Sequence, residues 1–255
     1  MGGALLRGWL DRELADQYFV IEPNAGSDPF AGRRGVTVIA SPDALPASLT
    51  PDVIILAVKP QVMGDILAPY RRFAGRLILS IAAGKTLGFF ARLLDPAAPV
   101  VRAMPNTPAA IGRGIAVACA NPAVSPAQRV LCERLLGAVG EVGWVEDERL
   151  IDAVTAVSGS GPAYVFLLIE CLAKAGVAAG LPEDLAVRLA RATVAGSGEL
   201  ARLSTASAAR LREDVTSPGG TTRAALDVLM AQDGLEPLLT RAVLAAARRS
   251  RELAD

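Results

Sequence analysis

The sequence contains no histidine, and lysine occurs only three times in 255 residues. The absence of histidine excludes Ser-His-Asp triads, histidine acid–base pairs and metal sites with imidazole ligands. Cysteine is also scarce, and Cys119, Cys132 and Cys171 show no CxxC spacing, which argues against a disulfide framework and a thiolate metal site. We therefore expect a protein without a metal that works in a reducing compartment, the cytoplasm.

An excess of charge is missing as well, because 26 Lys and Arg residues balance 26 Asp and Glu residues. This balance argues against nucleic acid or an anionic membrane as the main partner. No signal peptide is predicted, and the most apolar stretch, Ala163–Leu172, is too short to span a bilayer and contains Glu170. With 52% hydrophobic residues, the chain can form a sizeable core in two modest domains or one large one.

Short apolar runs alternate with helical patterns in the first half of the chain. Val53–Val58 is apolar on both faces, as expected for a strand between two helix layers. This alternation predicts βαβ units, a parallel sheet and an α/β Rossmann-like domain. The predicted strands are Tyr18–Glu22, Val36–Ala40, Val53–Val58, Leu77–Ile81, Val100–Ala103, Ile115–Ala118 and Gly143–Val145. The helices between them are Gln61–Ala68, Leu87–Leu94 and Pro126–Gly137, the last with Ser125 as its N-cap.

Strand signals end near Asp147, and the rest of the chain shows helical spacing throughout. We therefore place a domain boundary there, with a dinucleotide-binding domain over residues 1–147 and an all-α domain over residues 148–255. The predicted helices run from Glu148 to Ser158, Pro162 to Val177, Glu183 to Leu203, Ala206 to Glu213, Thr221 to Ala231 and Glu236 to the C-terminus.

The beginning of the sequence lacks the strand and the leading glycines that normally open a nucleotide-binding sheet. Met1-Gly2-Gly3-Ala4 runs directly into an amphipathic helix with Trp9 and Leu10. Either the natural chain starts further upstream, or the protein manages without a first strand. We favour the first alternative, because the helix keeps two glycines where a phosphate would lie; against it, two glycines after a methionine can also be without meaning.

Three turns follow predicted strands at the sheet edge where α/β proteins bind ligands. Ala57-Val58-Lys59-Pro60 and Ala82-Ala83-Gly84 let a flat ring or ribose approach the backbone, although each can also be an ordinary strand-to-helix turn. Met104-Pro105-Asn106-Thr107-Pro108 holds Asn106 between two prolines, either for a ligand or as a rigid polar turn. Further upstream, Glu22 favours NAD, whereas Asn24 and the following arginine pair favour NADP.

Two glycine-rich segments interrupt the helical half. Ser158-Gly159-Ser160-Gly161 precedes Pro162 and indicates close approach of a ligand to the backbone, with a plain helix break as the alternative. Ser217-Pro218-Gly219-Gly220-Thr221-Thr222 leads into a helix whose N-terminus can hold a carboxylate, with a threonine cap as the alternative.

These motifs, in this order, resemble pyrroline-5-carboxylate reductases over essentially the whole chain. The resemblance implies a Rossmann-like domain, a helical domain that interlocks with a second subunit, and reduction of 1-pyrroline-5-carboxylate to L-proline with NADPH, with NADH as the alternative. It assigns cofactor binding to Met1, Gly2, Asn24, Ala57, Val58, Lys59, Pro60, Ala82, Ala83, Gly84 and Asn106. It assigns substrate binding to Ser158, Gly159, Ser160, Gly161, Gly219, Gly220, Thr221 and Thr222, with Thr222 near the ring nitrogen as the catalytic residue.

The chemistry of a cyclic imine agrees with the missing histidine, since a protonated imine is electrophilic without a strong enzymic acid. A hydroxyacid dehydrogenase needs a base, and Val165 stands where related enzymes place a lysine. Two alternatives remain open: another Rossmann-type imine reductase, for example a deazaflavin-dependent one, and an N-terminally truncated homologue with impaired catalysis. We expect an obligate homodimer or a higher oligomer in either case.

Overall fold

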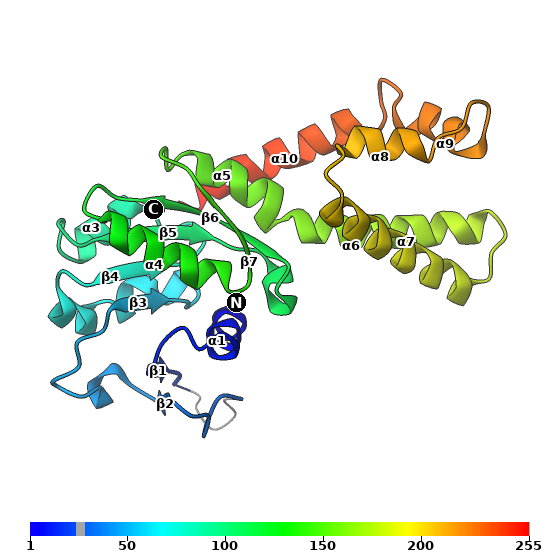
Figure 1. Ribbon diagram of the computed structural model, residues 1–255. Helices are drawn as coiled ribbons and strands as arrows, with labels where there is room; N and C mark the ends of the chain where they lie inside the picture. Colours follow the sequence, from blue (N-terminus) through cyan, green and yellow to red (C-terminus); the bar gives the residue numbers. More distant parts are fainter. Residues whose placement is uncertain (24–28, 255) are drawn as a thin grey trace. The chain divides into compact units, whose positions relative to one another are not determined.

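The computed structural model describes residues 1–23 and 29–254 and divides the chain into two compact units (Figure 1). The first unit contains Met1–Gly159 together with the C-terminal segment from Ala247, and the second contains Ser160–Ala246. The division after Gly159 lies beyond the boundary that the sequence suggested at residue 147. The reason is that α5 (Leu150–Val154) packs on the strands with Ile151 buried, although it is helical.

All seven strands expected from the sequence are present, with ends that differ by a few residues. They are β1 (Tyr18–Ile21), β2 (Val36–Ile39), β3 (Val53–Leu56), β4 (Leu77–Ser80), β5 (Val100–Met104), β6 (Gly114–Ala120) and β7 (Gly140–Trp144). Within the described residues they form a two-stranded sheet, β1-β2, and a five-stranded sheet in the order β3-β4-β5-β6-β7. The chain opens with helix α1 (Gly2–Asp11), so no strand of the described residues joins β1 to β3.

The sheet is parallel from β3 to β5, as the alternating pattern predicted, and β6 then runs antiparallel to β5. The connection between β5 and β6, residues 105–113, is short and contains the helix η5 (Thr107–Ile111), followed by Gly112 in the left-handed region at φ +69°. A parallel return needs a crossover of a dozen or more residues, so this short connection forces the antiparallel pairing. β7 pairs parallel with β6.

Two apolar clusters cover the two faces of the larger sheet. Successive residues of β4 point to opposite faces, so Leu79 joins the cluster of α1 and α4 while Ile78 joins the cluster of α3. Trp9 of α1 donates its ring N–H to the carbonyl of Leu135 in α4 at 2.7 Å, which ties these two covering helices together. The sheet is therefore buried on both faces, as its continuous apolar strands predicted.

The helices of the first unit follow the sequence expectation closely. Ser125 and Gln128 form a reciprocal capping box at the start of α4, with Pro126 at the first helical position. The predicted helix Gln61–Ala68 is present as consecutive short helices, a 3-10 turn over Pro60–Val62, an α-helical turn over Met63–Ile66 and a further 3-10 helix from Ala68 that contains Pro69. The helical elements are η2 (Pro42–Ala44), η3 (Pro60–Val62), α2 (Met63–Ile66), η4 (Ala68–Phe73), α3 (Leu87–Leu93), α4 (Pro126–Gly137) and a π-helical turn over Thr155–Gly159.

The second unit is all helical, and α10 also reaches into the first unit. Its helices are α6 (Gly161–Ala178), α7 (Glu183–Leu203), α8 (Ala208–Asp214), α9 (Thr221–Leu229) and α10 (Leu235–Glu252). α6 packs against α7 through small residues, with Ala173, Ala186 and Ala190 buried. Many larger apolar side chains of this unit face outward, among them Phe166 at 59% exposed and Leu167 at 57%.

The apolar stretch around α6 is longer than the sequence pattern predicted. The helical region Leu150–Ala178 extends over 29 residues and is long and apolar enough, by length and composition, to cross a membrane. The expected stretch Ala163–Leu172 is only part of this region, so the expectation from the sequence underestimated its apolar length. Ser158 and Gly159 lie in the π-helical turn that follows α5, and α6 begins after Ser160. The most apolar window of Leu150–Ala178 is only 11% buried inside the chain, so this surface requires a covering partner.

Candidate active site

The carboxyl ends of β3, β4 and β5 lie along one edge of the sheet, since these strands are parallel neighbours. Three of the motifs identified in the sequence follow these ends directly. Ala57, Val58, Lys59 and Ala83 are exposed there, while Pro60 and Asn106 are half-buried. The structure thus brings the predicted cofactor-binding turns together on one edge, where Ala82 is buried and Lys59 faces solvent.

The N-terminus of α1 lies at the same edge. A side chain at Gly2 would place its Cβ 3.0 Å from the Cβ of Ala57, so the backbone of Gly2 lies directly beside the end of β3. Met1 is the N-cap residue of this ten-residue helix, and no side chain caps it. The free N–H groups and positive dipole end of α1 therefore form a cradle that fits a phosphate group.

The Ala82–Gly84 turn is held by its neighbours from inside the sheet. Ser80 is fully buried, and its hydroxyl accepts a hydrogen bond from the N–H of Ala82 at 3.3 Å. The N–H of Ile81 donates to the carbonyl of Leu56 in β3 at 3.0 Å. Gly84 adopts φ +75°, in the left-handed region that favours glycine. The turn is thus a defined backbone surface with no bulky side chain.

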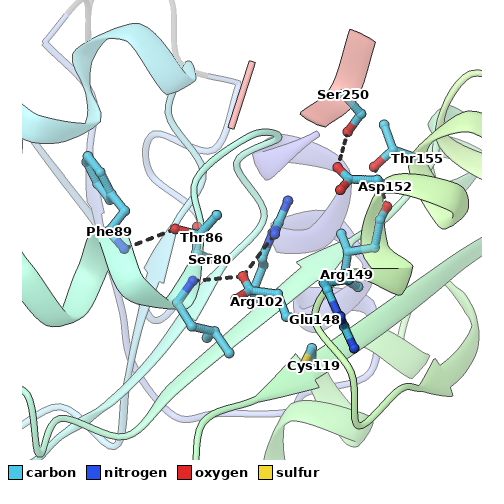
Figure 2. Close-up of polar contacts among 12 residues, drawn as sticks. Ser80, Thr86, Phe89, Arg102, Cys119, Glu148, Arg149, Asp152, Thr155 and Ser250 are labelled. Atoms are coloured by element: carbon cyan, nitrogen blue, oxygen red, sulfur yellow. Dashed lines mark hydrogen bonds and ion pairs between the residues drawn. The ribbon is translucent and has the colours of Figure 1, made fainter. Parts of the chain in front are cut away.

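Glu148 fixes the other end of this turn. Its Oε1 accepts the N–H of Leu87, at the start of α3, at 2.8 Å and also pairs with the guanidinium of Arg102 at 2.9 Å (Figure 2). Arg102 lies in β5 and is only 4% exposed. A buried cation of this kind requires a negatively charged partner, and Glu148, which follows the last strand β7 in the sequence, provides it.

Cys119 lies beside this ion pair, and its thiol stays protonated. Burial raises the pKa of Cys119 first, the negative charges of Glu148 and Glu146 raise it further, and Arg102 lowers it. Its Sγ lies 3.9 Å from the carbonyl of Glu146. A protonated, buried thiol is a poor nucleophile, so Cys119 has a packing role.

Asn106 has a structural contact in addition to its predicted role. Its side-chain oxygen accepts the N–H of Ile115 at 2.9 Å, which joins the end of β5 to the start of β6. The side-chain amide of Asn106 is therefore held both by the neighbouring prolines and by this hydrogen bond. Asn24, the other asparagine assigned to cofactor binding, lies outside the described residues.

Ser158 and Gly159 occupy the last part of the π-helical turn, close to the end of β5. Ser158 donates its hydroxyl to the carbonyl of Val154 at 3.0 Å. A Cβ at Gly159 would lie 2.5 Å from the terminal methyl of Met104, so the backbone of Gly159 lies beside the Met104 side chain, which is flexible enough to shift. Single π turns inside helices occur often at functional sites. Ser160 and Gly161, the other half of the motif, belong to the second unit.

The Gly219–Thr222 loop lies in the second unit and opens α9. Gly219 adopts φ +68°, and Gly220 is the N-cap residue, so Thr221 and Thr222 stand in the first helical turn. The alternative of a threonine cap is therefore wrong. The first N–H groups of α9 have no side-chain cap, and within the described residues the Thr222 hydroxyl makes no hydrogen bond. The loop can bind a carboxylate and offer it a hydroxyl.

Comparison with known proteins agrees with this geometry. Residues 148–253 match the family model described as pyrroline-5-carboxylate reductase dimerisation, and residues 1–84 match NADP oxidoreductase, coenzyme F420-dependent. The pyrroline-5-carboxylate reductase of Synechocystis is 42% identical over 99% of this chain and 96% of that protein. This chain belongs to the pyrroline-5-carboxylate reductase family.

Further members of the pyrroline-5-carboxylate reductase family support the assignment. The Pseudomonas aeruginosa reductase is 46% identical over 80% of this chain and 75% of that protein. The reductase structure from Coxiella burnetii covers 100% of this chain and 95% of its own, with a TM-score of 0.92 at 33% identity. The Plasmodium falciparum structure, determined with NADP bound, covers the same shares with a TM-score of 0.83 at 29% identity.

Family membership confirms the expected fold, enzyme class and reaction: an NAD(P)H-dependent oxidoreductase that reduces pyrroline-5-carboxylate to proline. The dimerisation model covers the exposed apolar helices, so self-association accounts for a surface that the chain alone leaves uncovered. No role was predicted from the sequence for Ser80, Arg102 or Glu148. A charged residue inside the apolar strand Val100–Met104 was the signal that could have identified the Arg102 pair.

Proposed function

We propose that this chain reduces 1-pyrroline-5-carboxylate to L-proline with NADPH bound along the edge formed by β3, β4 and β5. The observation that carries the proposal is the convergence of three strand ends and the uncapped N-terminus of α1 on that edge. Ligands of open α/β sheets bind at this position, and phosphates bind at helix N-termini.

Each part of the dinucleotide has residues suited to it. Met1 and Gly2 would hold the phosphates. Ala57–Pro60 and Ala82–Gly84 would pack against the ribose and ring. Asn24 would contact the adenosine side, and Asn106, which follows β5, would add a further contact to the cofactor. When bound, the reduced nicotinamide supplies the hydride. We favour NADPH over NADH because Asn24 and the exposed Arg33 and Arg34 follow β1 in the sequence, where such residues favour the 2′-phosphate of NADP. Glu22, which directly follows β1, favours NADH.

The Gly219–Thr222 loop would bind the substrate carboxylate through the N–H groups at the start of α9. Thr222 would place its hydroxyl at the ring nitrogen, as an acceptor or as a relay for a proton. Ser158–Gly161 would line the nicotinamide and substrate region. Because the protonated imine is already electrophilic, these residues need only position the substrate and stabilise its charge. The absence of histidine is compatible with this chemistry.

The cofactor edge and the carboxylate loop lie in different compact units. As the family resemblance implied, we propose that two copies share their parts to complete each site, so that a monomer is inactive. The protein would work in the cytoplasm, since Cys119 and Cys132 are buried free thiols, as in proteins of reducing compartments.

Steady-state kinetics with two substrates test the proposal. Initial rates are measured with 1-pyrroline-5-carboxylate and with 1-pyrroline, which lacks the carboxylate, each with NADPH and with NADH. We expect kcat/KM to be at least about tenfold higher for the carboxylated ring, since its charge pairs with the loop. Equal use of the two rings would contradict the loop assignment, and a preference for NADH would overturn the cofactor choice.

A further inference from the structure

The last turns of α10, from Ala247 onward, belong to the first compact unit. Ala247 and Ser250 are buried there, at 6% and 8% exposed. Ser250 is one of the few buried polar side chains among the described residues, and a buried hydroxyl requires a hydrogen-bond partner. The end of α10 is therefore a defined contact and not a loose tail.

The partner of Ser250 is Asp152 in α5, 98 positions away in the sequence. The hydroxyl of Ser250 donates to Oδ1 of Asp152 at 2.6 Å, the separation typical of a strong hydrogen bond to a carboxylate (Figure 2). Glu148, one helical turn before Asp152, holds the N–H of Leu87. The carboxylates of Glu148 and Asp152 thus contact Leu87, which follows the Ala82–Gly84 turn in the sequence, and Ser250 near the end of α10.

The carbonyl of Leu253, just beyond α10, lies directly against that turn. A side chain at Gly84 would place its Cβ 2.9 Å from the Leu253 oxygen and 3.5 Å from its carbonyl carbon. The outer side of the turn at Gly84 is therefore covered by the C-terminal segment, while Ser80 and Glu148 hold it from within.

We propose that Asp152 and Ser250 are positioning residues for the dinucleotide: their hydrogen bond clamps the end of α10, so that Leu253 keeps the Ala82–Gly84 turn in its binding conformation. The proposal rests on the proposed function in one respect, namely that this turn contacts the cofactor. All residues of the clamp belong to the first compact unit.

Two variants test the clamp in the full-length protein. Ser250→Ala removes the hydroxyl, and a chain ending at Glu252 removes the Leu253 carbonyl. We expect each to raise the dissociation constant and the KM of NADPH about three- to tenfold, with kcat and the KM for 1-pyrroline-5-carboxylate within about twofold of wild type. Amide hydrogen exchange over residues 82–87 becomes faster in both variants.

Ser125→Ala is the matched control, since it removes a serine hydroxyl that caps α4 elsewhere in the same unit. It lowers thermal stability but leaves NADPH affinity and exchange at residues 82–87 unchanged. If the two clamp variants behave like this control, Asp152 and Ser250 are structural residues only and the proposal fails. If wild type does not bind NADPH, the proposed function fails, while hydrogen exchange still decides whether the clamp orders the turn.

Discussion

Thr222 stands in the first turn of α9 with a hydroxyl that no described residue engages. We expect Thr222→Ala to lower kcat/KM for 1-pyrroline-5-carboxylate about ten- to a hundredfold, since one hydrogen bond to a charged group is lost. The dissociation constant of NADPH changes little, because the predicted cofactor turns belong to the other compact unit. Steady-state kinetics and cofactor titration measure the two effects, and Thr222→Ser restores most of the rate.

The control for Thr222 is Ser207→Ala, which removes the side-chain cap of α8 in the same unit. It lowers the melting temperature with unchanged kinetics. Should Thr222→Ala show this same pattern, Thr222 is a structural residue and its catalytic assignment is wrong.

Cys132 gives a prediction about pH. Burial raises the pKa of its thiol from 9.0 to about 12, so between these values the folded chain keeps a proton that the unfolded chain loses. The free energy of unfolding therefore falls as pH rises above 9.0, by up to about 1.4 kcal/mol per pH unit from this group. Urea denaturation of wild type and Cys132→Ala at fixed protein concentration measures the difference in slope. Identical slopes would show that Cys132 does not contribute.

Glu148 joins three elements, β5, α3 and the start of α5, and its loss is expected to affect all of them. Glu148→Gln leaves the Arg102 guanidinium without its counter-charge at 5% side-chain exposure, which we expect to cost about 3 kcal/mol of unfolding free energy. Glu146→Gln is the matched control, because the Glu146–Arg129 pair has the same kind of contact at 2.8 Å with Glu146 84% exposed. This control costs less than about 1 kcal/mol. Equal losses in chemical denaturation would contradict the importance of burial.

At the level of elements, the sequence predicted strands well because each one is a short apolar run between turn residues. It did not predict the antiparallel entry of β6, since strand direction depends on the length of the connection at Pro105–Arg113 and not on apolar pattern. The break expected at Ser158–Gly161 is present, because α6 begins anew after its N-cap residue Ser160, but the π-helical turn over Thr155–Gly159 was not predicted. Contacts such as Asp152–Ser250 join residues far apart in sequence, and no local pattern indicates them.

The motifs at the site were predicted from chemistry and from the family resemblance, and the structure places Ala57–Pro60, Ala82–Gly84 and Asn106 at one edge of the sheet. What supports them was not visible in the sequence. Ser80 and Glu148 each accept a hydrogen bond from a backbone N–H group, and Glu148 also pairs with Arg102 in the neighbouring strand, with no local sequence pattern that marks either contact. Such supporting contacts follow from tertiary packing alone.

For the whole molecule, the exposed apolar side chains of α6 are expected to form the dimer interface. Phe166→Glu introduces a charge on this surface, so it yields monomers near the chain mass of 26.4 kDa with little or no reductase activity. Val130→Glu introduces the same charge at a site on α4 that is 57% exposed, and this control remains dimeric and active. Analytical ultracentrifugation with activity assays measures both. An active Phe166→Glu monomer would contradict shared sites.

The most direct measurement is the oxidation of NADPH by the purified wild-type protein on addition of 1-pyrroline-5-carboxylate, with the L-proline formed quantified in the same sample. We expect oxidation only when protein, NADPH and substrate are all present, with one proline formed for each NADPH consumed. Binding of NADPH without any substrate-dependent oxidation or proline formation would contradict the assignment of this chain as a pyrroline-5-carboxylate reductase.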